Sequence, residues 1–262
     1  MSRLEYKYLV PVEQLSQLRD ALSPFVETDA YTPEMAKEYT VHSLYFDTLS
    51  LDYYYQKLAG IQHRLKIRAR GYNTETKDSI VFLEIKRKDD IYVSKNRACI
   101  FYKHIRDIFV SSDKKQYVRN GDGTPHAIDN ARKFFYHMYR YSLRPTILIH
   151  YGREAFFQKF NKSFRITLDK NIRSTPFPGL EDLYSEGRTE PSLLGFFVLE
   201  VKFNRDVEFL PKWLTSILDN FNLKKTSVSK YTISLDTHGI PIQSDKHSIL
   251  AFSHGYHFKS RN

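Results

Sequence analysis

The 262-residue sequence contains a single cysteine, Cys99. One thiol cannot close an internal disulfide, and no group of cysteines and histidines has the spacing of a structural zinc site. No run approaches the roughly 20 apolar residues that a membrane-spanning helix needs, and Arg3, Glu5 and Lys7 interrupt the apolar stretch that a signal peptide requires. We therefore expect a soluble, cytoplasmic protein in a reducing compartment, without structural zinc.

Negative charge is scarce relative to positive charge. Lysine and arginine number 40 against 30 aspartates and glutamates, which gives a formal net charge of +10. This balance predicts an anionic partner but does not identify it. With 41% hydrophobic residues, the chain can bury one large core or two small ones.

Internal repeats, heptads and low-complexity segments are also missing. A period of two residues dominates instead, which is typical of antiparallel strands with one buried face. Strands are predicted at 3–10, 41–47, 62–71, 79–88, 91–101, 144–153, 163–169 and 196–204. Helices are predicted at 11–23, 50–58, 127–141 and 210–221.

Two stretches lack this period. Residues 111–126 are polar and contain glycine, so we interpret them as a mobile loop within a helical insertion at about 103–142. Residues 172–195 contain several prolines and glycines, which predicts an irregular excursion across one end of the sheet. We expect a single domain over residues 1–240, followed by a C-terminal tail, 241–262, for which the sequence predicts no function.

Charged residues alternate with apolar ones in six of the predicted strands. Because residues i and i+2 of a strand share a face, each such strand presents one charged face. These faces carry eleven cations: Arg3, Lys7, Arg64, Lys66, Arg68, Arg70, Lys86, Lys88, Arg153, Arg165 and Lys202. They carry four anions: Glu5, Glu84, Asp169 and Glu200. Lys95 and Arg97 alternate in the same way in the segment 91–101.

A solvated outer face is the simpler interpretation for any single strand. It is less favoured when six strands share the pattern, because like charges on neighbouring strands repel each other. If the sheet closes with this face inward, the cations surround a bore suited to a long anion with many oxygens. Arginine offers forked donors to phosphate and lysine a compact charge. The sequence therefore predicts a closed antiparallel β tunnel that holds a polyphosphate-type anion.

The four carboxylates on these faces are candidates for a metal site. Glu84, Glu200, Asp169 or Glu5 could bind Mg²⁺ or Mn²⁺ beside the phosphates through hard oxygen ligands. An ion pair with a neighbouring lysine or arginine is the alternative for each of them.

Nucleic acid is a less favoured partner. Proteins that bind single strands place aromatic side chains on the same face as their charges. Here Tyr6, Tyr8, Phe164 and Phe203 fall on the opposite face.

The same segments resemble a known family. The motifs are EYKYLV (5–10), HSLYFDT (42–48), RLKIRARGY (64–72), FLEIKRK (82–88), YGREAFF (151–157), FRITLDKNIR (164–173), VLEVKFN (198–204) and SVSKY (227–231). In this order they are similar to the VTC domain, the catalytic domain of the vacuolar transporter chaperone complex and its soluble bacterial relatives. That family lies within the triphosphate tunnel metalloenzymes, the CYTH-like superfamily.

The resemblance implies an α+β fold, a closed antiparallel eight-stranded β-barrel with flanking helices. It also implies a metal-dependent polyphosphate polymerase that transfers the terminal phosphoryl of ATP, or another nucleoside triphosphate, to a growing inorganic polyphosphate chain. The residues expected to be catalytic are Lys7, Arg68, Arg70, Lys86, Arg165 and Glu200. Glu200 is the expected ligand of Mn²⁺ or Mg²⁺.

A second set of residues is expected to bind the nucleotide or the polyphosphate. Within it, Arg153, Ser229 and Lys230 match positions of the family motifs and would steer the chain end. The other members come from the charged faces of the predicted strands: Arg64, Lys66, Lys88, Lys95, Arg97 and Lys202.

Two positions depart from the family pattern. Arg3 stands where simple triphosphatases have a glutamate, which favours the VTC branch. Ser227 stands where the family's polymerases tend to have lysine, and Lys224 or Lys225 could replace it. Two alternatives therefore stay open: a non-catalytic sensor of polyphosphate or an inositol pyrophosphate, and an inorganic triphosphatase. A membrane partner that receives the product also stays possible.

Overall fold

The computed structural model describes residues 3–29, 37–76, 78–119, 126–160, 163–185, 187–204, 207 and 209–240. The predicted tail, 241–262, and residues 120–125 of the predicted loop 111–126 lie outside the described residues. The strands are β1 (Arg3–Pro11), β2 (Val26–Thr28), β3 (Tyr39–Asp47), β4 (His63–Tyr72), β5 (Ile80–Asp89), β6 (Tyr92–Phe101), β7 (Arg144–Gln158), β8 (Phe164–Pro176), β9 (Glu190–Pro191) and β10 (Phe196–Asn204). The α-helices are α1 (Leu15–Leu22), α2 (Asp52–Leu58), α3 (Ile105–Val110), α4 (Ala127–Arg140), α5 (Lys212–Asn220) and α6 (Lys230–Thr237).

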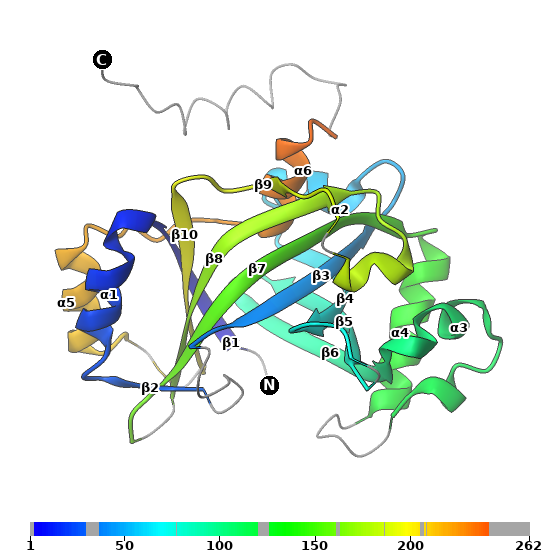
Figure 1. Cartoon of the computed structure of the whole chain (residues 1–262), viewed down its shortest axis with the longest axis horizontal. Helices are drawn as coiled ribbons and strands as arrows, with labels where there is room; N and C mark the ends of the chain where they lie inside the picture. The colour runs from blue at the N-terminus through cyan, green and yellow to red at the C-terminus, as the bar shows by residue number, and fades with distance from the viewer. Residues whose placement is uncertain are drawn as a thin grey trace.

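Eight of these strands are hydrogen-bonded in a ring. Its order is β7, β3, β4, β5, β6, β1, β10 and β8, and β8 pairs again with β7. All pairings are antiparallel, β2 extends the sheet beside β7, and β9 does so beside β8 (Figure 1). The eight predicted strands are therefore confirmed as elements, and the fold is α+β. The two short strands were not predicted, and β7 and β8 run further than the sequence indicated.

The pairing around the ring is uneven at one joint. β1 pairs with β10 along its whole length, from Arg3 to Pro11. Among the described residues, it pairs with β6 only at Arg3 and Leu4. Beyond that point the chain before α6 lies along β1, where the backbone N–H of Thr226 donates to the carbonyl of Lys7 (2.8 Å).

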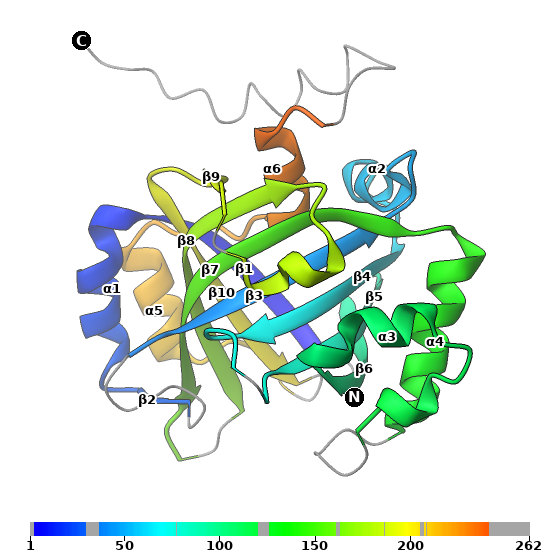
Figure 2. The ribbon, with the colours of Figure 1, turned by 45° about the vertical axis from the view of Figure 1, so that its right-hand side comes forward.

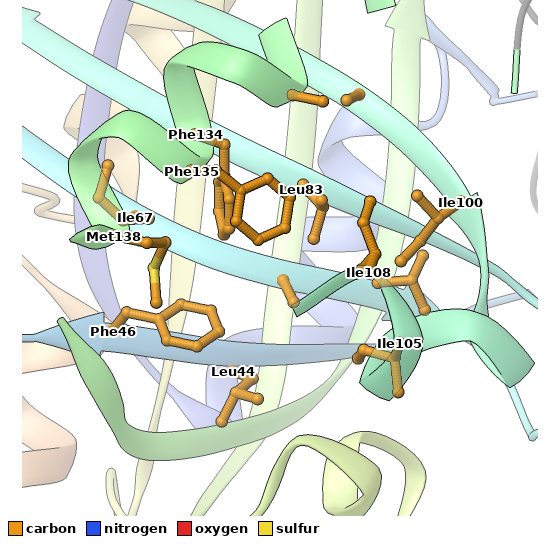
Figure 3. Packing of buried hydrophobic residues seen from close by; sticks show 14 of the residues in the cluster. Leu44, Phe46, Ile67, Leu83, Ile100, Ile105, Ile108, Phe134, Phe135 and Met138 are labelled. Carbon is orange, nitrogen blue, oxygen red and sulfur yellow. The ribbon is translucent and has the colours of Figure 1, made fainter. Parts of the chain in front are cut away.

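The apolar faces of the strands point away from the ring and are covered by helices. The pair α3 and α4 packs on β3 to β6, where Phe134 and Phe135 contact Ile67 and Leu83 (Figure 3). The pair α1 and α5 covers β1, β8 and β10 on another side of the ring (Figure 2). Because the outward faces are apolar, the charged faces of the same strands point to the interior.

Helix α6 fills part of this interior. Tyr45 lies opposite Arg68 in the β3–β4 register and so shares its inward face. Tyr231 of α6 is 1% exposed, stacks on Tyr45 and packs with Leu235 and Val198 in one buried cluster. The sequence did not predict α6. The segment 172–195 was predicted to be irregular, which is wrong in part because β8 continues to Pro176 and β9 pairs with it.

Candidate anion-binding site

The interior charges are shielded from solvent. Arg68, Arg70 and Arg153 are between 5% and 8% exposed, while Glu84 and Asp169 are 0% exposed. A solvated outer face would leave such side chains in water. The charged side chains of β4, β5, β7, β8 and β10 instead converge inside the ring.

Glu84 is the centre of a first ion-pair cluster. Its carboxylate accepts hydrogen bonds from Arg68 Nε (2.8 Å) and Arg97 Nη2 (2.6 Å), and Lys95 Nζ lies 3.5 Å away. Burial alone would raise the pKa of Glu84, but Arg68 and Arg70 lower it well below its usual range. Glu84 therefore stays ionised as a structural counter-ion, the alternative that the sequence left open.

A second cluster joins strands and α6. Asp169 Oδ1 accepts a hydrogen bond from Arg153 Nε (2.6 Å), and Oδ2 accepts one from Arg153 Nη2 (2.8 Å). Lys230 Nζ lies 2.6 Å from the same Oδ2. Arg153 Nη2 also lies 3.9 Å from Glu200. Since Lys230 is the first residue of α6, this cluster anchors the helix within the ring.

Glu200 lies between cations. Lys202 Nζ is 2.9 Å and Lys7 Nζ is 3.6 Å from its oxygens. Burial acts to raise the pKa of Glu200, but Lys202 and Lys7 lower it well below its usual range. Burial in turn lowers the pKa of Lys202 to about 7, although Glu200 opposes the shift. Glu200 is thus an ionised carboxylate at the border between the ion-pair network and a pocket.

This pocket has a volume of about 420 Å³ and opens beside the weak β1–β6 joint. Seven of its lining residues are cationic: Lys7, Lys57, Arg64, Lys66, Lys86, Lys88 and Lys225. Among the described residues that line the pocket, Glu5, which Lys86 contacts at 2.7 Å, is the single carboxylate. Ser227, Val228 and Ser229 complete one side. The cations therefore outnumber the anions by six.

This excess charge perturbs the cations themselves. Burial, reinforced by Lys7 and Lys86, lowers the pKa of Lys66 well below its usual range. Burial and nearby cations likewise lower the pKa of Lys57 and Lys88. Close cations are stable together when an anion neutralises them, so the pocket is built for a multiply charged anion.

The segment before α6 is held in the pocket by these lysines. Ser229 is the N-cap of α6, and its Oγ accepts a hydrogen bond from Lys66 Nζ (2.8 Å). Lys57 Nζ donates to Ser227 Oγ (3.0 Å), and Lys7 Nζ donates to the Val228 carbonyl (3.4 Å). When an anion binds, these lysines would exchange neutral acceptors for charged oxygens, which bind ammonium groups more strongly.

The predicted site residues fall into two groups. One group lines the pocket: Lys7, Arg64, Lys66, Lys86, Lys88 and Ser229. The other forms or borders the buried network: Arg68, Arg70, Lys95, Arg97, Arg153, Arg165, Glu200, Lys202 and Lys230. Arg165 pairs with Asp29 (2.7 Å), a partner that the strand pattern did not indicate.

Sequence reasoning missed Lys57 altogether. It lies near the end of α2, so the alternation along strands could not reveal it. Lys225 had been proposed as a replacement for a lysine at position 227. Its Nζ lies 3.6 Å from the centre of the Tyr6 ring, at the pocket wall.

The residues present allow a metal only together with an anion. Among the described residues, no three histidine, cysteine or carboxylate side chains converge in a metal-like group. Glu200 alone would offer one carboxylate, surrounded by ammonium groups. A divalent cation there would need phosphate oxygens and water to complete its shell, which is how Mg²⁺ commonly binds beside nucleotides.

Comparison with known families identifies the chain. The model of the VTC domain matches residues 2–238, so the protein belongs to the VTC domain family. This family is linked to polyphosphate synthesis. Among curated proteins, no relative matches the chain. In the described residues no helix is both long and apolar enough to cross a bilayer.

Two solved structures show remote likeness. The PH1819 protein from Pyrococcus horikoshii OT3 has 15% identity and a TM-score of 0.45, over 90% of this chain and 99% of that chain. The Mediator head module of Schizosaccharomyces pombe has 10% identity and a TM-score of 0.38, over 85% of this chain and 92% of the matched chain. At these values neither likeness bears on the function.

Proposed function

We propose that the protein is a polyphosphate polymerase whose ring of strands acts as a tunnel. Family membership supports the substrate class, and the pocket with six excess cations supports a binding place for a triphosphate. In this proposal a nucleoside triphosphate such as ATP is the donor, and the end of an inorganic polyphosphate chain is the acceptor. A cytoplasmic location stays a prediction.

The pocket lysines are proposed to bind the triphosphate. Lys7, Lys66 and Lys86 project into the pocket from β1, β4 and β5, so together they can contact oxygens of successive phosphates. Binding of the anion stabilises the charged form of Lys66, whose pKa burial, Lys7 and Lys86 depress. Phosphoryl transfer needs mainly such positioning and charge neutralisation.

The chemical step requires no protein nucleophile. An oxygen of the acceptor's terminal phosphate forms a bond to the γ-phosphorus, and the bond from that phosphorus to the β–γ bridging oxygen breaks. Nucleoside diphosphate leaves with the electron pair, and the polymer is one phosphate longer. Because the acceptor oxygen is already ionised, no general base is needed.

Glu200 is proposed as the protein ligand of Mn²⁺ or Mg²⁺. A bound ion would supply positive charge beside the phosphates, while Glu200 would hold it. Arg68, Arg70 and Arg165 were expected to touch the triphosphate, but each already contacts partners in the wall. We propose instead that these arginines contribute to the positive electrostatic potential of the interior. Arg153 and Lys230, which pair with Asp169, would guide the chain end through the same potential, and Ser229 through its hydroxyl at the pocket wall.

The test is incubation of the purified protein with ATP and Mn²⁺. We expect ADP and a long anion that stains with DAPI, and we expect Lys66→Ala to reduce both. Arg188→Ala, an exposed arginine outside the pocket, is the matched control. Intact ATP after prolonged incubation would refute the enzyme proposal. Release of orthophosphate from inorganic triphosphate, without polymer, would identify a triphosphatase.

The filled end of the ring favours one alternative, a non-catalytic sensor. Tyr231 and Leu235 of α6 occupy the interior, and Lys230 is paired with Asp169. A sensor would bind polyphosphate or an inositol pyrophosphate tightly without turnover. In a sensor, Glu200→Ala would leave the affinity for this ligand unaffected. In a polymerase, the same change would abolish the metal-dependent activity.

A further inference from the structure

We propose that the outer face of α4 is a docking surface for an anionic lipid bilayer. This inference goes beyond the proposed function and concerns a different part of the molecule. The face lies outside the ring beside β5 and β6 (Figure 2). Of the described pocket-lining residues, none belongs to α4.

The two faces of α4 differ sharply. Phe134, Phe135 and Met138 point to the strands and are at most 7% exposed (Figure 3). On the opposite face, Lys133, Tyr136 and Arg140 follow one another at helical spacing and are exposed. The apolar residues of α4 therefore pack in the core, and its basic and aromatic residues face solvent, where a partner can contact them.

Exposed side chains around this face combine positive charge with aromatic rings. Tyr136 is 59%, Tyr139 61% and Tyr141 44% exposed. Val110, at the end of α3, is 85% exposed, and the contact of Tyr139 Oη with the Phe109 carbonyl (3.3 Å) places it nearby. Tyrosine next to lysine and arginine is the composition of side chains that settle at the level of lipid headgroups.

The charge of this region is complementary to an anionic bilayer. Residues 103–144 contain nine lysines and arginines against four aspartates, a net charge of +5, which is half that of the chain. Arg132 pairs with Asp129 (2.9 Å), but in the described structure Lys133, Arg140 and Arg144 have no carboxylate within ion-pair distance. Each such cation near an anionic surface strengthens binding about five-fold.

A bilayer fits this face better than a nucleic acid. Proteins that bind single strands guide the backbone along a basic groove. Here the rings and cations project from one convex helix, with an apolar valine at its border. A flat, deformable surface can contact all of them at once, which a narrow strand cannot.

The test is co-sedimentation of the full-length protein with vesicles of phosphatidylcholine, with and without phosphatidylglycerol, in the presence of excess inorganic triphosphate to occupy the pocket. We expect binding only to the anionic vesicles. Lys133→Glu with Arg140→Glu should weaken it by about 25-fold or more. Arg188→Glu with Lys212→Glu, which reverses two exposed charges elsewhere, is the matched control.

A second variant tests the aromatic part. Tyr136→Ser with Tyr139→Ser should weaken vesicle binding while leaving its salt dependence unchanged, because the charges remain. Equal binding of the charge-reversed protein and wild type would overturn the proposal, as would equal binding to both kinds of vesicle. Loss of binding to a single-stranded oligonucleotide in the same variants, without any vesicle binding, would assign the face to nucleic acid. Polymerase activity is not a readout of this experiment, so the two proposals fail independently.

Discussion

Tyr231→Phe should loosen the wall of the anion pocket from a distance. Asp47, which is 0% exposed, ends β3 and accepts a hydrogen bond from the hydroxyl of Tyr231 in α6. Its two oxygens also accept hydrogen bonds from the backbone N–H groups of Thr48 (2.7 Å), directly after β3, and of Tyr53 (3.0 Å) and Tyr54 (3.1 Å) at the start of α2. One carboxylate thus joins the strand to both helices.

The magnitude follows from the bond that is lost. Removing the hydroxyl leaves a buried carboxylate with three donors in place of four, which costs about 1.5–3 kcal/mol of unfolding free energy. At roughly 2–4 °C per kcal/mol, the melting temperature should fall by several degrees. Triphosphate affinity should fall too, because Lys57 of α2 and Ser229, the N-cap of α6, line the pocket.

Urea denaturation and calorimetric titration with inorganic triphosphate measure the two effects. Tyr136→Phe is the matched control, since this exposed hydroxyl should change stability by no more than about 0.5 kcal/mol. If Tyr231→Phe is as stable as the control and binds triphosphate equally well, Asp47 does not couple the helices and the reasoning fails.

Three further predictions concern single charges. Lys66→Met should weaken triphosphate binding and flatten its salt dependence, as titrations at several salt concentrations would show, while an unchanged slope would place the anion elsewhere. Glu84→Gln should destabilise the fold by about 3–5 kcal/mol, because Arg68 and Arg97 lose a buried partner; a stable variant in urea would contradict the ion-pair assignment. Burial and His42 lower the pKa of His150 to about 4, so this histidine is neutral in the folded protein. The contribution of neutral His150 to the unfolding free energy should therefore be full above about pH 6.5 and fall by up to about 3 kcal/mol as the pH falls toward 4. In acid-unfolding curves, His150→Phe should reduce this loss.

The strand pattern predicted much of the fold and the direction of the charges. Alternation in β4 alone indicates that Lys66 and Arg68 share a face, and the structure places both inside the ring. Period-two patterns reveal faces because the geometry of a strand is local. The resemblance to the VTC family, carried by these same segments, is confirmed by the family match.

The pattern could not show which interior cations line the pocket and which pair with buried carboxylates. Arg68 and Lys66 look alike in sequence, yet Arg68 is bound to Glu84 and Lys66 lies in the pocket. That difference depends on contacts between strands. Lys57 stayed hidden because its contact, Ser227, lies 170 positions later in the chain. The strand-rich sequence also gave no sign that α6 would occupy the interior.

The ring joins the first described strand, β1, to the last, β10, since Arg3 lies opposite Asn204. During synthesis β1 must wait for β10 to leave the ribosome before it finds its main neighbour. Until then, the arginines and glutamates of the middle strands remain hydrated. Such a distant pairing makes closure a slow, late event, and α6, following β10, can enter the interior only afterwards.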